Sequence, residues 1–536
     1  MGTSEGQTRT RPTRRRWWIA QAVAVAVLSV SGCASPRAIR WPDVGAPPEP
    51  AAETGSIEPN LAPSVPAAEE EFPIDLTTAL RLAEAENPMI AEARQRIGEV
   101  VAQQQRAMAM LLPTLNLGMN LHMHAGNLQR SSGSILKVNE TSLYFGGGSG
   151  AVASGPPVIP GVNIVGHLAN AIFEPLAARM RVEASRRDAT ATANTILLEV
   201  SELFFELLAA EAETQARKES AVEEAEVARL TRAYADAGQG RYADAERAAT
   251  ELRMIELQLR QAEEAAAVGS ARLSHRLHLD QTVRVRPIVP EVEMITLVDP
   301  TVPLPALIQA ALRGRPEIGA RGAEVEAAEI RHRQELYRPF LPTIFIGFSG
   351  GAFGGGSNLA PPQLSGFAGR TDFDVGAFWT LRNLGAGNLA AQKRRQAQTG
   401  EAVAARQLAI AQTRTEVGAA FADVAAARRR VALTTDQLAS ARDGFREDLL
   451  RIQNTVGRPI EVVDSLKLLN DARVDRIRAV TDYNKAEFRL FVSLGSPPPV
   501  PDADNQPLPE APIASPPLPP LMGKLVPPAR VVRPEF

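Results

Sequence analysis

The sequence predicts a mainly helical chain with a few short strands, built as two similar halves. Three observations predict this class: motifs that recur at a nearly constant offset, stretches in which polar and apolar residues alternate, and the long proline-free stretches 176–236 and 388–455. Aromatic residues make up only 5 % of the chain, which favours long helices with small-residue contacts. The net charge of −3 gives no electrostatic argument for binding nucleic acid.

The repeat is visible in residue pairs that share one spacing. Pro88 matches Pro316, and Leu112-Pro113 matches Leu341-Pro342, at offsets of 228 and 229 residues. Four later pairs share an offset of 217 residues: Glu199 with Glu416, Phe204 with Phe421, Gly240 with Gly457 and Leu277 with Leu494. Insertions would scramble chance matches, so the constant spacing predicts an internal duplication.

The N-terminal 32 residues predict a secretory signal peptide. A segment with five arginines precedes the apolar stretch 17–30, which is too short to span a bilayer because a helix needs roughly 20 residues for that. The stretch ends in Val30-Ser31-Gly32-Cys33, which resembles the bacterial lipobox, whose cysteine is acylated. We therefore expect a covalent lipid on Cys33, the only cysteine, and Ala34 favours sorting to the outer membrane. An ordinary signal peptide and a basic tail are the alternatives.

Proline-rich segments flank the repeats. Residues 33–72 are rich in Pro, Ala and Glu without an apolar period, which predicts a spacer. Residues 496–536 have the same character and predict a disordered tail. The domain organisation expected between them is a first repeat at 73–285, a connection at 286–303 and a second repeat at 304–495.

Each half begins with a broken helix that leads into a strand. A helix is expected over 76–111 with a break at Asn87-Pro88, and another over 304–340 with a break at Arg315-Pro316. A period of two then predicts one-sided strands at 114–125 and 343–349. In the first strand Leu115, Leu117, Met119, Leu121 and Met123 alternate with Asn116, Gly118, Asn120, His122 and His124.

Glycine-rich segments follow these strands, and we expect loops at 126–160 and 350–370. A second strand is expected in each half, near 161–173 and 373–379. Helical hairpins are expected to finish each half, with turns at the glycines near 238–240 and at 457.

The strands imply an oligomer. Strands of about ten residues have the length of transmembrane β-strands, and lipid does not tolerate open sheet edges. Four strands are too few to close a barrel, so other copies of the chain must contribute strands.

The residues 75–495 resemble the TolC-type outer-membrane efflux protein family. The resemblance rests on the Asn-Pro break, the Leu-Pro before the strand, the two long hairpins, and Phe373–Trp379 leading to the turn Leu384-Gly385-Ala386-Gly387; Phe173-Glu174-Pro175 is a poorer copy of that turn. It implies a homotrimer whose 12-stranded barrel in the outer membrane continues into a helical tunnel in the periplasm. It also implies passive export, without catalysis or a cofactor, alongside a periplasmic adaptor protein and an inner-membrane pump of an efflux or type I secretion system.

The resemblance also suggests functional residues at the hairpin tips. Adaptor hairpins are expected to contact the tips at Gly238, Gly240, Val456, Gly457 and Arg458. Glu461 and Asp464 lie three residues apart on one helix face and match the paired acidic positions of the family's tunnel entrance. Three copies would form acidic rings that select cations and gate the entrance. A solvated acidic helix face and glycines that only permit turns are the alternatives.

Two other functions compete with the channel. A lipidated coiled-coil scaffold of the cell envelope would explain the helices but not the one-sided strands. An esterase would use Ser349 within Gly347-Phe348-Ser349-Gly350-Gly351, a pattern that needs a strand turning directly into a helix. His122 and His124 lack further ligands for a metal, and we expect them to face a barrel lumen.

Overall fold

The computed structural model describes residues 70–149, 159–280, 282–288, 292–453 and 458–499. The chain divides into two units, residues 1–67 and 68–536, and every described residue belongs to the second. The predicted signal peptide 1–32, Cys33, most of the spacer and the tail from residue 500 lie outside the described residues. In the described part, no helix is long and apolar enough to cross a bilayer.

The broken helices form as predicted. They are α2 (Leu76–Glu86) with α3 (Pro88–Met108), and α6 (Leu304–Gly314) with α7 (Pro316–Tyr337). At the first break the side-chain oxygen of Asn87 accepts a hydrogen bond of 3.0 Å from the N–H of Met89, while Pro88 occupies the first helical position. The cap and the proline together end one helix and start the next.

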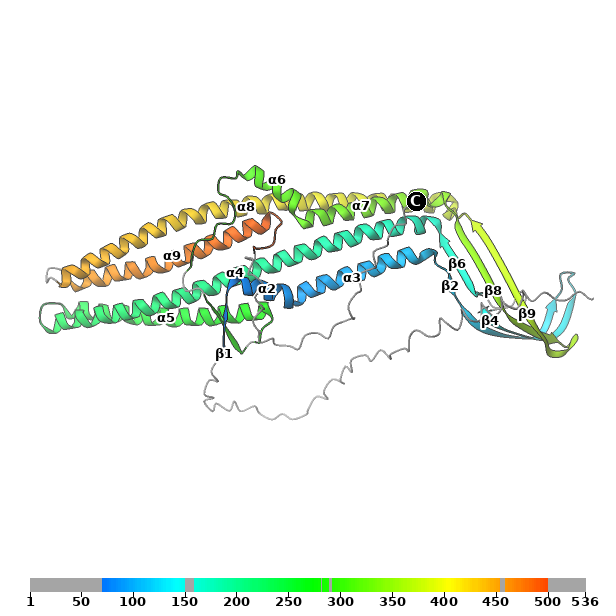
Figure 1. The fold of residues 1–536 in the computed structure, drawn as a ribbon, viewed down its shortest axis with the longest axis horizontal. Helices are drawn as coiled ribbons and strands as arrows, with labels where there is room; N and C mark the ends of the chain where they lie inside the picture. Colours follow the sequence, from blue (N-terminus) through cyan, green and yellow to red (C-terminus); the bar gives the residue numbers. More distant parts are fainter. Residues whose placement is uncertain (1–69, 150–158, 281, 289–291, 454–457, 500–536) are drawn as a thin grey trace, which may run out of the picture. The chain divides into compact units, whose positions relative to one another are not determined.

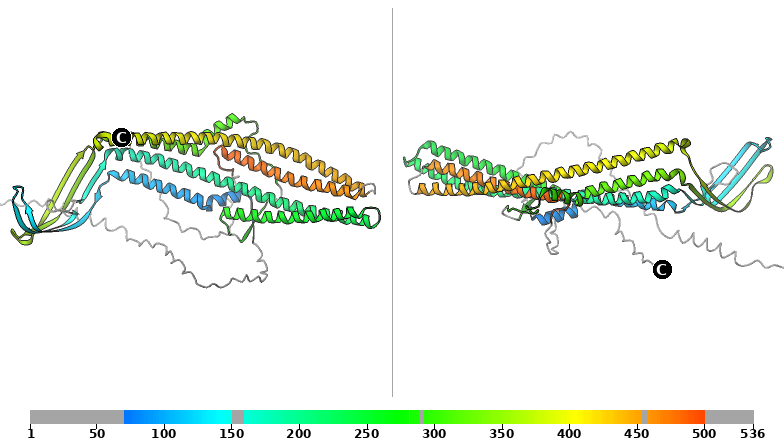
Figure 2. Two further views of the ribbon diagram at one scale, coloured as in Figure 1. Left: turned by 180° about the vertical axis from the view of Figure 1, so that it is seen from behind. Right: turned by 90° about the horizontal axis from the view of Figure 1, so that it is seen from above.

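Two long helical hairpins run side by side (Figures 1 and 2). They are α4 (Leu168–Asp236) with α5 (Tyr242–Leu277), and α8 (Ala386–Gln453) with α9 (Pro459–Ser493). The expected strand 161–173 is wrong beyond His167, and Phe173-Glu174-Pro175 is helix rather than a turn. The reason is the cap: Nδ1 of His167 accepts from the N–H of Ala169, so the helix starts early and Pro175 falls in its third turn.

The sheet is four strands wide, and we call each of these four positions a strand track, because some hold two strands end to end. Its strands are β2 (Thr114–Leu115), β3 (Leu117–Gln129), β4 (Ile135–Ser149), β5 (Ile159–Pro160), β6 (Val162–His167), β8 (Thr343–Ser357) and β9 (Ala360–Phe378). Both β4 and β6 pair antiparallel with β8 at successive registers, Gly147 opposite Gly350 and Val162 opposite Phe348, so they form one track. The tracks lie in the order β2/β3, β4/β6, β8, β9, which confirms four strands per chain.

The glycine-rich segments are strands for much of their length, so the expected loops at 126–160 and 350–370 are wrong. The glycines allow two backbones to lie against each other where β4 meets β8. A Cβ on Gly146 would lie 2.6 Å from the Cα of Gly351. A close backbone approach of this kind is a common reason for glycine inside a strand.

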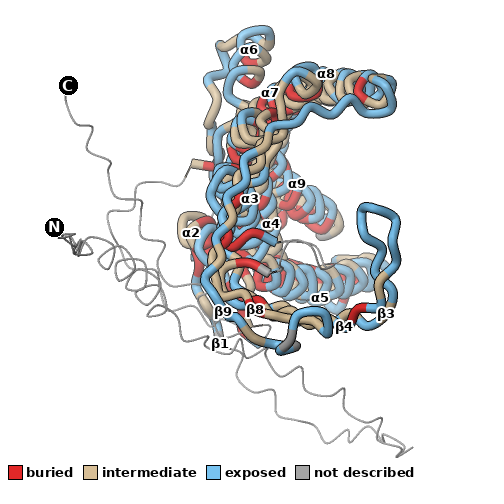
Figure 3. The backbone as a smooth tube through the Cα atoms, turned by 90° about the vertical axis from the view of Figure 1, so that its right-hand side faces the viewer, coloured by how far each residue is buried: buried red, intermediate tan, exposed pale blue. Residues whose placement is uncertain are grey.

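Each strand track continues into a helix, and the helices pack in the same order as the tracks. The track β2/β3 follows α3, β4/β6 leads into α4, β8 follows α7, and β9 leads into α8 through a turn at Arg382–Gly385. The packed pairs are α3 with α4, α4 with α7, and α7 with α8. Sheet and helices therefore form one continuous curved layer (Figures 1 and 3). The order of elements repeats between the halves, and the internal duplication stays a prediction.

An ion-pair ladder joins the two hairpins along α4 and α9. Four basic residues of α9 pair with four glutamates of α4: Arg489 with Glu202, Lys485 with Glu206 at 3.5 Å, Arg478 with Glu213 at 2.7 Å, and Arg473 with Glu223 at 2.6 Å. Because the helices are antiparallel, the glutamate number rises as the partner number falls. Exposed pairs stabilise by up to about 1 kcal/mol each, so the ladder sets register more than stability.

The segment between the repeats is held by side chains of α9. Strand β7 (Val283–Pro287) pairs with β1 (Glu70–Ile74), which begins inside the predicted spacer. Beyond it, the N–H groups of Leu297 and Val298 both donate to Oε2 of Glu487 at 3.2 Å, and the N–H of Ile295 donates to Oδ1 of Asn484 at 2.8 Å. Both α9 side chains are buried, so they satisfy backbone groups that have no strand partner.

Candidate functional site

One face of the sheet is apolar and exposed. Leu115, Val162, Phe348 and Phe373 lie opposite one another in a row across all four tracks, and they are 39 % to 68 % exposed. Along β3 the side chains of Leu117, Met119, Leu121 and Met123 continue this face and are 57 % to 76 % exposed. Figure 3 colours most residues of these strands as exposed or intermediate. An apolar patch that spans a whole sheet is typical of a membrane or interaction surface.

The opposite face is mostly polar. His122 and His124 lie there, half-buried, as the alternation predicted. Cross-strand pairing places Glu140 beside His124, and Arg370 forms an ion pair of 2.9 Å with Asp372 on the same face. No group of three or more metal-binding side chains occurs in the described part of the chain. The sheet is therefore apolar on one side and mostly polar on the other, although Val165 and Phe378 are exposed apolar residues of the second face.

The esterase hypothesis is wrong. Ser349 lies on the polar face within β8, and that strand runs on to Ser357 instead of turning into a helix. Its cross-strand neighbour is Asp372, and the side chain is buried. A nucleophile elbow needs the strand-to-helix turn that is missing here.

Both edges of the sheet are open. The strand β3 pairs only with β4, and β9 pairs only with β8, among the residues that the structure describes. Each edge presents unpaired N–H and C=O groups over more than ten residues. Such edges are templates for further strands.

The far ends of the hairpins carry the predicted tip residues. Gly238 adopts a φ of 73°, which glycine tolerates best, and the N–H of Gly240 donates to the C=O of Tyr234 at 3.0 Å. Val456 and Gly457 lie outside the described residues, and Arg458 precedes α9 as its N-cap. The hydroxyl of Tyr234 donates to the C=O of Ile452 at 3.1 Å, so the two hairpins are linked near their tips.

The two predicted entrance acids have different surroundings. Oε2 of Glu461 accepts from the N–H of Arg458 at 3.4 Å and lies 3.6 Å from Arg451 of α8, so this carboxylate caps α9 and bridges its hairpin. Asp464 is exposed and makes no ion pair with a described residue. It lines a groove of about 470 Å³ between α5 and α9, together with Arg247 and Lys467.

Sequence reasoning missed a buried acid. Glu224 of α4 is fully buried, and neither carboxylate oxygen has a hydrogen-bond partner in the described part of the chain. Burial raises the pKa of Glu224 from 4.5 to about 7, with a further contribution from Glu251 of α5 and an opposing one from Lys467 of α9. The local sequence gives little sign of this burial: position 224 shares a helical stripe with Ser220, Val227, Thr231 and Ala235, which is only partly apolar, and the structure shows that all five are buried.

Comparison with known proteins identifies the fold. No family model matches the chain, and no curated protein matches it significantly. Solved structures do match. A membrane protein from Pseudomonas aeruginosa superposes with a TM-score of 0.65 at 18 % identity, covering 81 % of this chain and 98 % of that one. CusC superposes with a TM-score of 0.62 at 17 % identity, covering 81 % and 97 %. The open state of the Neisseria gonorrhoeae outer-membrane channel MtrE gives 0.60 at 16 % identity, covering 79 % and 90 %.

The chain therefore has the fold of these outer-membrane channels. This confirms the predicted TolC-like class, in which long helical hairpins join a four-stranded contribution to a sheet.

We expect Glu224 to make hairpin packing pH-dependent. Its pKa is raised in the folded protein, so its contribution to stability is complete below about pH 4.5 and is lost as the pH rises through about 7. The shift corresponds to about 3 kcal/mol at most. Hydrogen exchange of the amides at 220–231, measured from pH 5 to 8 and corrected for intrinsic rates, should show this loss.

The substitution Glu224→Gln should remove the pH dependence, because the glutamine does not ionise. The matched control is Glu226→Gln, two residues away and solvent-exposed, with a pKa that its hydrogen bond to Arg229 lowers. The control should keep the wild-type profile. An unchanged profile in Glu224→Gln would contradict the assignment.

Proposed function

We propose that this chain is a subunit of an outer-membrane export channel. Three copies would pool four strand tracks each into a closed 12-stranded barrel, with the apolar face toward lipid and the polar face toward the lumen. The helices, continuous with the tracks, would extend the wall into the periplasm. Such a duct is passive and non-enzymatic.

One observation carries this proposal: a sheet with an exposed apolar face, a polar opposite face and two open edges. In water the apolar face would be uncovered, and in lipid the edges would be unsatisfied. Closure with identical copies would pair the edges, and insertion of the closed barrel into a bilayer would cover the apolar face. A cell-envelope scaffold would not need a two-faced sheet between its helices.

The duct would work within a tripartite efflux or type I secretion system. An inner-membrane pump would supply energy and choose the cargo, which could be small molecules, ions or proteins, and a periplasmic adaptor would dock on the hairpin tips. The proposed contact points are the turn at Gly238 and Gly240 and the segment Val456, Gly457 and Arg458.

An arginine should have different effects on the two faces of β3. Met119→Arg places a charge on the apolar face and should cost about 2–4 kcal/mol at the bilayer midplane, so the yield of membrane-inserted trimer should fall. His122→Arg, on the polar face, should leave the yield unchanged and lower cation selectivity. Size-exclusion chromatography of extracted membranes and planar-bilayer conductance measure the two effects.

A wild-type protein that carries no ion current would exclude the channel. Equal yields of the Met119→Arg and His122→Arg proteins would show that the exposed face of β3 does not meet lipid.

At the periplasmic end we propose that Asp464 dominates ion selectivity and that Glu461 mainly holds its hairpin. Asp464 is exposed and unpaired in the described part of the chain, whereas Glu461 contacts Arg451 and the start of α9. Asp464→Asn should therefore reduce the cation-to-anion permeability ratio more than Glu461→Gln does. Reversal potentials in a salt gradient would decide, and equal effects would reject this division of roles.

We propose that Cys33 carries a lipid that anchors the chain to the outer membrane. Cys33→Ser should lower the mass of the mature protein by that of the lipid and its attachment. Intact-mass spectrometry of protein from membranes measures this. An identical mass apart from the cysteine-to-serine difference would show that Cys33 is not acylated.

A further inference from the structure

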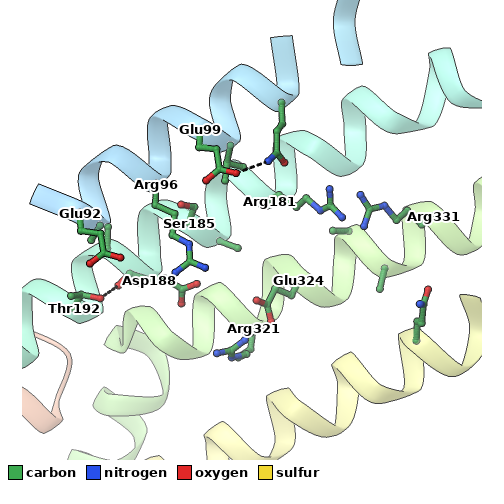
Figure 4. A pocket seen from close by; sticks show the side chains of 18 of the residues that line it. Glu92, Arg96, Glu99, Arg181, Ser185, Asp188, Thr192, Arg321, Glu324 and Arg331 are labelled. Carbon is green, nitrogen blue, oxygen red and sulfur yellow. Dashed lines mark hydrogen bonds and ion pairs between the residues drawn. The ribbon is translucent and has the colours of Figure 1, made fainter. Parts of the chain in front are cut away.

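A large groove runs along α3, α4, α7 and α8. Its volume is about 940 Å³, and arginines from several helices line it (Figure 4). Arg181 belongs to α4, Arg331 to α7 and Arg395 to α8, so segments far apart in sequence bring three guanidinium groups to one end of the groove. The side chains of Arg181 and Arg331 extend toward each other in Figure 4.

These three arginines lack adequate partners within the described residues. Arg331 has only a long contact of 3.7 Å with Glu174, and Arg395 donates from Nη1 to the neutral Gln398 at 3.0 Å. Nε of Arg395 is buried without a hydrogen-bond acceptor. Arg181 makes neither a hydrogen bond nor an ion pair with any described residue.

The rest of the groove is different. Arg321 forms an ion pair of 2.7 Å with Glu324, and Asp188 lies close enough to Arg321 and Arg96 for their charges to act on it. The excess of positive charge is therefore confined to the end that holds Arg181, Arg331 and Arg395. We call these three residues the arginine cluster.

The positive charges of the arginine cluster repel one another. Burial lowers the pKa of Arg331, and the charges of Arg181 and Arg395 lower it further, while Glu174 opposes them. Like charges that face one another in a partly dry groove are stabilised when an anion lies between them. Guanidinium groups have the planar fork that matches two oxygens of a carboxylate or phosphate.

We propose that the arginine cluster binds an oxyanion group, a phosphate or a carboxylate, within this groove. The groove has the volume of a small-molecule site. The arginine cluster lies at the end of the groove nearer the sheet: Arg395 is nine residues into α8 and Arg331 six residues before the end of α7, which is about 9–14 Å along a helix. The anion could belong to a dissolved solute or to a phospholipid headgroup beside the sheet. The site itself does not depend on the proposed channel function.

Inorganic phosphate is the first probe. Isothermal titration of the purified full-length protein, against sodium chloride of equal ionic strength, should show saturable binding. Arg181→Gln should weaken that binding at least tenfold without affecting folding, since this exposed side chain makes no contact that would be lost. The double variant Arg331→Gln/Arg395→Gln should abolish it. The control Arg333→Gln removes an exposed arginine of α7 that pairs with Glu329 at 3.5 Å and does not line the groove, and it should bind like the wild type.

Two further arms identify the source of the anion. Phosphatidylglycerol retained through detergent exchange by the wild type, but not by Arg181→Gln, would assign the site to lipid; native mass spectrometry measures this. A fall in anion permeability in Arg181→Gln, recorded in neutral bilayers, would assign it to a dissolved solute. Absence of saturable phosphate binding in the wild type, or equal binding in Arg181→Gln and Arg333→Gln, would overturn the proposal.

Discussion

Unpaired strand edges are the constraint on which the rest of this structure depends. The strands β3 and β9 each leave one side of their backbone without a partner among the described residues. The apolar face between these edges is unfavourable in water, and the unpaired backbone groups of the edges are unfavourable in lipid. A closed wall made from several copies would pair the backbone groups of both edges, and a bilayer around that wall would cover the apolar face.

The order of the helices follows the order of the strands in that sheet. Because each track is covalently continuous with a helix, and α3, α4, α7 and α8 pack in track order, closing the sheet also closes a wall of helices. The ion-pair ladder between α4 and α9 and the network around Glu487 then fix how the hairpins lie against that wall. The ion pairs join the first half of the chain to the second.

Charged groups without close partners in the described residues are candidates for contact with ions, protons or ligands. Many arginines of the helices pair with a glutamate or aspartate three or four residues away or on a neighbouring helix. Among the charged groups without a close ion pair in the described residues are exposed Asp464 near the hairpin tips, buried Glu224 between α4, α5 and α9, and the arginine cluster. In our proposals Asp464 attracts cations, Glu224 takes up a proton, and the arginine cluster binds an oxyanion.

The sequence by itself determined what depends on local periodicity and steric rules. The alternation at 114–125 and the breaks at Pro88 and Pro316 appear in the structure as predicted, because strand and helix periods and missing N–H groups are local properties. Only the tertiary structure decided the state of the glycine-rich segments. Glycine has no strong preference for strand, and here the close approach of β4 and β8 requires it. The surroundings of Glu224 and the convergence of Arg181, Arg331 and Arg395 were equally hidden, since burial and charge contacts arise between helices that packing alone brings together.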